Sequence, residues 1–293
     1  DGIRNTCSRC STSKCDCPEG CSFWGIMPRL DSEGHIITMH VTWLQIIVIL
    51  ASGVVAGFVN TMAGGGSFLT LAALNFAGLP ILLANGTNRI AVLIQNIAAV
   101  LGFRSKGVSD FKLSLQFAIP ATLGSLVGAY VVVDWPEVVF ERVLAVAMLL
   151  MLVTLLFDSK RWIKEHQVQM TRTRQLISYP LFFAIGFYGG AIQAGVGFML
   201  IASLVMVAGV GLVRANSHKV FIVAAFTVVA VIIFIVRDQV NWVLGVVLSA
   251  GNATGAWIAS RLAVEKGEKL VRIVLAIMLA YLSLGYLGLI PQL

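Results

Sequence analysis

The glycine-rich stretch Ala56-Gly-Phe-Val-Asn-Thr-Met-Ala-Gly-Gly-Gly-Ser67 has a counterpart later in the chain, Gly186-Phe-Tyr-Gly-Gly-Ala-Ile-Gln-Ala-Gly-Val-Gly-Phe198. The two stretches lie about 130 residues apart, and each leads from one apolar run into another without a polar loop between them. Glycine clusters in apolar sequence can interrupt a helix, because glycine has no side chain to restrict its backbone. The pair therefore predicts one interrupted helical element in each half of the chain.

Further matches between the halves occur in the same order and at a nearly constant spacing. In each of the following pairs the second member lies in the second half: Ala84-Asn85 and Ala215-Asn216, Asn88-Arg89 and His218-Lys219, Gly124…Gly128 and Gly251…Gly255, Arg142-Val-Leu144 and Arg272-Ile-Val274. Apolar, glycine-rich helices can resemble one another through composition alone, but here polar positions match as well. We interpret the matches as an internal repeat.

The composition is that of an all-α polytopic membrane protein. Apolar residues make up 58% of the 293 residues, charged residues only 12%, and the mean hydropathy is +0.89. Soluble domains carry about 45–50% apolar and about 25% charged residues, so this chain cannot cover a globular surface with polar groups. A soluble enzyme, a nucleic-acid-binding module and a disordered scaffold are excluded, and no nucleic-acid partner is expected. The net charge of +7 fits Lys and Arg retained on cytoplasmic loops.

Ten apolar segments are expected to be helical. They cover roughly residues 41–60, 66–79, 86–103, 113–133, 139–157, 179–192, 196–212, 215–236, 242–262 and 270–290. Most have about 18–22 residues, enough to cross about 30 Å of hydrocarbon. The short segments 66–79 and 196–212 form either full crossings or the returning arms of re-entrant hairpins. In both cases the halves, with about five segments each, have opposite orientations, as in the inverted repeats of many secondary transporters.

The distribution of Lys and Arg predicts the orientation in the membrane. The most basic patch is the linker 159–178, so we expect it in the cytoplasm together with residues 104–112 and 266–272. Residues 134–137 and 237–238 are then external, as are both termini. The chain divides into an extension, a first membrane repeat, the basic linker and a second membrane repeat, with the boundaries 1–38, 39–158, 159–178 and 179–293.

The glycine clusters are the first candidate for a binding site, since each precedes a short helix. Helix N-termini present free N–H donors and about half a positive charge, which suits an anion. If both short helices begin near the midplane, their positive ends converge on one point. The alternative is close packing between helices, which we favour for Gly128 and Gly255. The candidate residues, with one hydroxyl, are Gly64, Gly65, Gly66, Ser67, Gly195 and Gly197.

Two basic side chains, Arg89 and Lys219, lie inside apolar segments. A cation at the centre of a membrane helix costs about 2.5–3.5 kcal/mol on an insertion scale and is usually functional. Neither residue has an acidic neighbour in sequence, so each could bind an anion, and arginine can hold an oxyanion with two hydrogen bonds. The alternative is that these long side chains reach out to the lipid headgroups.

Polar residues near these cations complete the candidate site. Asn88 and Gln95 are seven residues apart and share one face of a helix, and Gln193 lies in the second glycine stretch. Each could donate to an anion or bond across helices. His218 could couple transport to protons or act as a plain hydrogen-bond partner. No Asp or Glu lies well inside a segment, so a carboxylate proton relay is not expected.

All five cysteines lie near the start of the chain, at positions 7, 10, 15, 17 and 21. Such a cluster could bind zinc or form external disulfides, although an odd number leaves one thiol over. Because Met39 looks like a natural start, we interpret residues 1–38 as an extension without a role in transport. No cofactor and no metal site are predicted for the membrane repeats.

At these residues the chain resembles the sulfite exporter TauE/SafE family, a broad group of probable anion transporters. The resemblance covers about residues 39–288 and includes both glycine stretches, Ala84-Asn-Gly-Thr-Asn-Arg89, Arg214-Ala-Asn-Ser-His-Lys219 and the closing stretch 255–272. It implies export of sulfite or a small organosulfonate across the bacterial inner membrane, with the small anion and the lipid as partners. Import of a related compound such as thiosulfate, or transport of another small anion, fits the same residues.

Other classes of function have less support in the sequence. A membrane-embedded enzyme needs a catalytic motif, and the chain has no His-Glu-x-x-His, no pair of intramembrane aspartates and no Gly-x-Ser-x-Gly, so no enzymatic activity is expected. A redox or metal sensor would depend on the cysteine segment. A homo-oligomer is compatible with the sequence, which does not define an oligomeric state.

Overall fold

The computed structural model describes residues 42–108, 111–144, 146 and 172–286, and within these ranges all regular secondary structure is helical. The helices are α1 (Trp43–Met62), α2 (Ser67–Phe76), α3 (Ile81–Ser105), α4 (Phe111–Val132), a stretch at 137–144, α6 (Arg172–Ala191), α7 (Val196–Ala208), α8 (Leu212–Val236) and α9 (Trp242–Tyr286). The all-α prediction is confirmed. The extension 1–38, most of the segment 139–157 and much of the linker 159–178 lie outside the described residues.

Four stretches in the described part of the chain are long and apolar enough to cross a membrane: Trp43–Met62, Lys112–Val132, Leu212–Val236 and Trp242–Lys266. Helix α3 has the same length as α8, 25 residues, but a lower mean hydropathy, because it carries polar side chains that the fold buries. Large apolar side chains such as Leu126 and Ile232 are exposed on the outside of the helices, where lipid would surround them. These features are those of a membrane-integral protein.

Local sequence accounts for several of the helix ends. Helix α1 begins with a capping box, in which Thr42 Oγ1 accepts from the backbone of Gln45 and Gln45 Oε1 accepts from that of Thr42. Helices α2 and α7 begin at glycine, with Gly66 and Gly195 as N-caps, and neither has a side-chain cap. Their first N–H groups therefore lack the partner that most helices obtain from a capping side chain.

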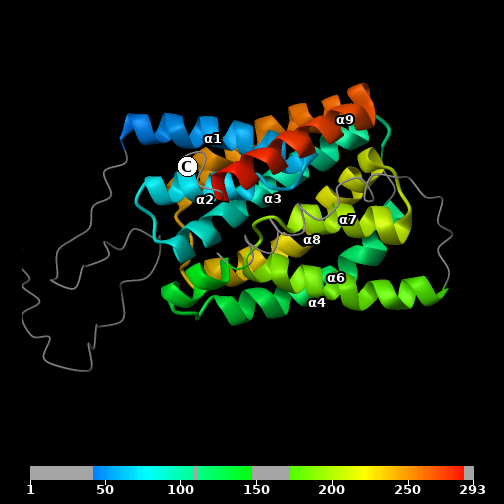
Figure 1. The fold of residues 1–293 in the computed structure, drawn as a ribbon. Helices are drawn as coiled ribbons and strands as arrows, with labels where there is room; N and C mark the ends of the chain where they lie inside the picture. Colours follow the sequence, from blue (N-terminus) through cyan, green and yellow to red (C-terminus); the bar gives the residue numbers. More distant parts are fainter. Residues whose placement is uncertain (1–41, 109–110, 145, 147–171, 287–293) are drawn as a thin grey trace, which may run out of the picture. The chain divides into compact units, whose positions relative to one another are not determined.

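Helices α2 and α7 are too short to cross a bilayer. Their 10 and 13 residues correspond to about 15 and 20 Å, against about 30 Å of hydrocarbon. The chain beyond α2 returns to the end of the molecule from which α1 starts (Figure 1). There the backbone of Ile81 donates to Glu137 Oε1 (2.9 Å), three residues after Asp134, which pairs with Arg237 (3.1 Å). We call this the Asp134 end, and α1–α2 is a re-entrant hairpin from it.

The second glycine stretch forms the matching hairpin from the opposite end. There the ion pair between Lys106 and Glu265 (2.6 Å) joins the end of α3 to α9, and Ser217 Oγ near the start of α8 donates to Val108 O (3.2 Å). We call this the Lys106 end; α6–α7 enters and leaves by it. The loops therefore group at the two ends as the charge distribution predicts. That the Lys106 end is cytoplasmic stays a prediction.

Each repeat contributes its fourth helix to the other repeat. Helix α9 packs along α1 and α3, whereas α4 packs along α6 and α8 (Figure 1). We call α1, α2, α3 and α9 the first bundle, and α4, α6, α7 and α8 the second bundle. The contacts are backbone to backbone: a Cβ placed on Gly255 would lie 2.0 Å from Val54 O, and one on Gly128 2.0 Å from Phe187 O. The packing role favoured for both glycines is confirmed.

The packing corrects one pairing between the halves. Sequence matching aligns Gly124 with Gly251, but Gly124 contacts the backbones of Phe183 and Phe187 in α6, and it is Gly255 that makes the corresponding contacts with Val54 and Phe58 in α1. The true spacing of α4 and α9 is thus 131 residues. Glycines four residues apart repeat once per helical turn, so a shift by one turn leaves the sequence pattern almost unchanged.

The end of the chain is helical over both segments that the sequence predicts there. The sequence predicts separate segments at 242–262 and 270–290, and the backbone is assigned as helical from Trp242 to Tyr286. The part that is long and apolar enough to cross a membrane is Trp242–Lys266, and the red part of the chain that follows it runs in the opposite direction (Figure 1). The basic patch between the two segments contains Gly267, a residue that weakens a helix.

Candidate functional site

The two glycine stretches meet inside the molecule. A Cβ placed on Gly64 would lie 2.5 Å from the Cα of Gly197, and one placed on Gly197 would lie 2.4 Å from the Cα of Gly64. Gly64 has a φ of +97°, and Gly195, the N-cap of α7, has a φ of +76°. Only glycine adopts such angles without strain. The starts of α2 and α7 are therefore in backbone contact, and both are buried.

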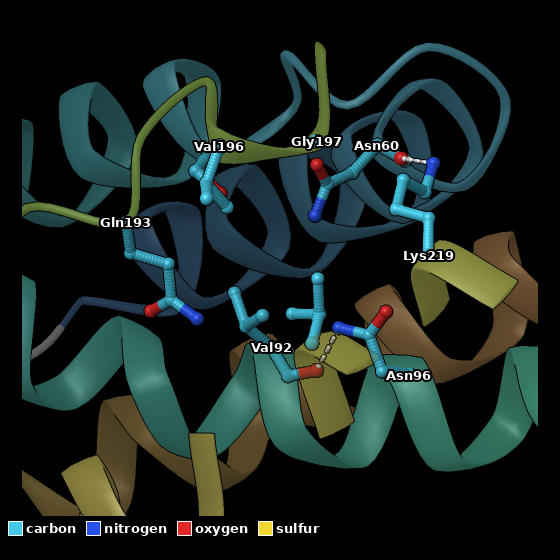
Figure 2. A pocket seen from close by; sticks show the side chains of 9 residues that line it. Asn60, Val92, Asn96, Gln193, Val196, Gly197 and Lys219 are labelled. Carbon is cyan, nitrogen blue, oxygen red and sulfur yellow. Dashed lines mark hydrogen bonds between the residues drawn. The ribbon is translucent and has the colours of Figure 1, made fainter. Parts of the chain in front are cut away.

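A small cavity lies beside this contact, between the two bundles. It has a volume of about 10 Å³, close to the smallest space that holds one water molecule. Figure 2 shows Gln193 and Lys219 on opposite sides of it, with Val92 and Asn96 of α3 along one wall. The first bundle contributes Asn60, Ser67, Val92 and Asn96, and the second contributes Gln193, Val196, Gly197, Lys219 and Val223.

The walls formed by α3 and α8 follow one sequence pattern. Side chains three or four residues apart lie on the same face of a helix. The equivalent positions, each 131 residues apart, are Asn85 and Asn216, Asn88 and Lys219, Val92 and Val223, Asn96 and Thr227. The structural counterpart of Lys219 is therefore Asn88, and not Arg89 as the sequence match suggests.

The ammonium group of Lys219 binds the C-terminal end of α1. Its Nζ donates to Asn60 O (2.9 Å), Thr61 O (2.7 Å) and Asn216 Oδ1 (2.9 Å), and its side chain is buried. Asn216 also donates to the carbonyl oxygen of Met62 (3.0 Å). The last carbonyl groups of a helix lack partners within the helix and carry partial negative charge, so a cation stabilises them.

Arg89 makes the equivalent contact with the C-terminal end of α6. Its two terminal nitrogens donate to Gly189 O (3.0 Å) and Ala191 O (2.8 Å), and Asn85 also donates to Ala191 O (3.1 Å). The guanidinium group is fully buried and lies 4.5 Å from the ring centre of Phe234. Both cations thus point inward, and neither reaches out to headgroups.

The other predicted site residues occupy different places. Ser67, Gln193 and Gly197 line the cavity with Lys219. Gly65 is buried next to the contact of the two hairpins, and Gly66 packs on α1, since a Cβ there would lie 2.1 Å from Ala56 O. His218 is bonded to Ser114 of α4 (2.8 Å) and is not among the residues that line the cavity. Contact of any of these residues with an anion stays a prediction.

Several buried amide groups near α3 have spare hydrogen-bonding capacity. Gln95 Oε1 accepts from Asn60 (3.2 Å), and Gln193 Nε2 donates to Thr227 (3.1 Å). Within the described residues, both amide atoms of Asn88, Gln95 Nε2 and Gln193 Oε1 are buried without a partner. Buried polar atoms are normally paired, so these are places where water or a polar solute would gain hydrogen bonds.

The sequence analysis does not select the valines of the cavity. Val92, Val196 and Val223 are apolar residues in apolar helices and carry no signal of their own. The signal for Val92 and Val223 is their place four residues after Asn88 and Lys219. As for metals, no cluster of three or more His, Cys, Asp or Glu side chains exists in the part of the chain that the structure describes. The cysteine segment lies outside that part.

Known proteins are similar in sequence to this chain over most of its length. Residues 49–286 match the sequence profile of the family described as Sulfite exporter TauE/SafE. The chain belongs to this family. It is 30% identical over 234 residues to "Probable membrane transporter protein ORF9" of Sinorhizobium sp, covering 80% of this chain and 89% of the relative.

Two further relatives carry similar descriptions. The chain is 29% identical over 245 residues to "Probable membrane transporter protein YfcA" of Escherichia coli strain K12, covering 80% of this chain and 87% of the relative. It is 27% identical over 236 residues to a "Probable membrane transporter protein" of Haemophilus influenzae, covering 79% and 90%. No solved structure matches the chain. As a TauE/SafE member the protein is a membrane transporter for a small molecule.

Proposed function

We propose that this transporter exports a small sulfur oxyanion, sulfite or an organosulfonate, across the bacterial inner membrane, and that the anion binds in the cavity between the two bundles. One observation carries the proposal: Ser67 at the start of α2, Val196 and Gly197 at the start of α7, and Lys219 line the same cavity. Uncapped helix N-termini and a cation together favour a negatively charged solute.

The charge balance around Lys219 supports an anion. Its three acceptors are two backbone carbonyls and one amide oxygen, which are neutral groups. No carboxylate forms an ion pair with it among the described side chains. An ammonium ion inside a membrane protein is costly, and a bound anion would reduce that cost. The hydroxyl of Ser67 and the amide of Gln193 are the neighbouring groups that can donate to its oxygen atoms.

The size of the cavity indicates how the anion would enter. A space of about 10 Å³ holds about one water molecule, so a sulfur oxyanion requires the two bundles to move apart. Nearly equal numbers of lining residues come from each bundle, as expected for a transporter whose site lies where inverted repeats meet. Export is the favoured direction for an anion, because a negative cell interior contributes about 2.3 kcal/mol per charge per 100 mV.

The test is sulfite efflux from proteoliposomes that contain the purified protein. Lys219→Gln should reduce sulfite flux by about tenfold or more, because the positive charge that attracts the anion to the cavity is lost. The matched control is Arg214→Gln, which removes an exposed cation from the same helix and should leave flux unchanged. Normal sulfite flux in Lys219→Gln would exclude the proposed site, and flux of thiosulfate but not of sulfite would exclude the proposed substrate.

A further inference from the structure

Arg89 connects the two bundles at a point away from the cavity. It extends from α3 in the first bundle to the carbonyl groups of Gly189 and Ala191 at the end of α6 in the second. Of the described residues, Lys219 lines the cavity and Arg89 does not. The difference follows from sequence position: Lys219 lies three residues after Asn216, but Arg89 lies four residues after Asn85. One residue corresponds to a rotation of about 100° around the helix axis.

The carbonyl groups that Arg89 binds lie directly before a wall of the cavity. Gln193 follows Ala191 by two residues and has a φ of +66°, an angle that residues other than glycine seldom adopt. Gly195 then caps α7, and Val196 and Gly197 line the cavity together with Gln193. A displacement of the end of α6 would therefore move three lining residues at once.

We propose that Arg89 is a positioning residue for transport: it holds the end of α6, and with it the wall from Gln193 to Gly197, without contacting the transported anion. This inference rests on the proposed function of the cavity. The guanidinium group balances the partial negative charge of the α6 carbonyls in a buried site, where the low dielectric constant strengthens hydrogen bonds. Asn85 assists, because its side chain donates to the same carbonyl oxygen of Ala191.

The alternative role, direct contact with the anion, makes a different prediction for a lysine variant. Arginine that holds an oxyanion does so with two parallel N–H groups, and lysine does not replace it there. Arginine that binds two backbone carbonyls is replaceable, since Lys219 binds two carbonyls at the equivalent end of α1 with a single ammonium group. The Nε–H group of Arg89 has no partner among the described residues, so the alternative needs a direct test.

The first measurement is sulfite transport in proteoliposomes by Arg89→Lys and Arg89→Gln, with Arg104→Gln as control for an exposed cation on the same helix. We expect Arg89→Lys to keep the KM for sulfite within about twofold, and Arg89→Gln to lose about tenfold or more of the flux because the wall is no longer held. A KM raised by about tenfold or more in Arg89→Lys, with unchanged thermal stability, would overturn the positioning role.

The second measurement uses no anion and therefore does not depend on the proposed substrate. The thermal unfolding midpoints of Arg89→Gln, Asn85→Ala and the double variant form a double-mutant cycle in detergent. Because both side chains donate to Ala191 O, the double variant should lose clearly less than the sum of the two single losses. Additive losses would contradict the shared contact. If the losses in unfolding midpoint are coupled but the protein transports no sulfite, the contact is supported and the proposed function is refuted.

Discussion

Replacement of Gly64 by alanine tests the contact on which the site depends. The new Cβ would meet the backbone of Gly197 at 2.5 Å, and the φ of +97° is unfavourable for alanine. In Gly78→Ala only the backbone angle is unfavourable, since Gly78 has a φ of +92° and nothing within 4 Å of its Cβ position. Comparing the two variants therefore separates the contact between the hairpins from the cost of the backbone angle.

The structure gives the expected magnitudes. A residue with a side chain in the left-handed region costs about 1–2 kcal/mol, which is the full expected loss for Gly78→Ala. Insertion of a methyl group into a packed site adds about 1–3 kcal/mol, so Gly64→Ala should lose about 2–5 kcal/mol in total. At about 2–4 °C per kcal/mol for a chain of this size, its unfolding midpoint should lie roughly 2–12 °C below that of Gly78→Ala.

The assay is thermal unfolding of the purified protein in detergent, followed by sulfite efflux at a temperature at which both variants stay folded. Because Gly64→Ala displaces the starts of α2 and α7, it should also abolish most of the flux, whereas Gly78→Ala should retain it. Equal unfolding midpoints and equal flux in the two variants would refute the argument, because the two hairpins would then not be in contact.

Three further predictions concern the bundles and the extension. Gly57→Ala should reduce the free energy of unfolding by about 1–3 kcal/mol and so lower the unfolding midpoint, because its Cβ would lie 2.2 Å from Asn252 O. Gly245→Ala makes only ordinary contacts and should leave the midpoint unchanged. Equal midpoints in the two variants would contradict the packing of α1 on α9. Glu265→Gln removes an exposed ion pair between α9 and the end of α3 and should leave the midpoint unchanged; a large decrease would show that the pair holds the bundle. Deletion of residues 1–38 should leave sulfite flux unchanged, and loss of flux in a folded protein would assign that segment a role in transport.

Much of the membrane region could be predicted from local sequence. Apolar runs of sufficient length specify the long helices, and glycine clusters within them specify the breaks before Ser67 and Val196. Polar residues in apolar segments, such as Lys219, could be recognised as candidates for a buried site, because a charge at that depth is costly. Each of these signals is contained within about one helix, which is why the sequence is sufficient.

The features that could not be predicted depend on side-chain direction or on distant contacts. Arg89 and Lys219 look equivalent in the sequence, but they lie four and three residues after the preceding asparagine, respectively. Because of this shift of one residue, Lys219 lines the cavity and Arg89 does not. The exchange of α4 and α9 between the repeats also leaves no local signal, because glycines spaced by four fit any partner helix with the same spacing.

The exchange of α9 has a consequence for biosynthesis. Gly57 obtains its packing partner only when Asn252 has entered the membrane, almost 200 residues later. At about 5–20 residues per second, a nascent chain waits roughly 10–40 s with this face of α1 exposed to lipid or to the insertion machinery. Neither half of the protein can therefore complete its packing alone, and two separately synthesised halves should be stable only when produced together in the same membrane.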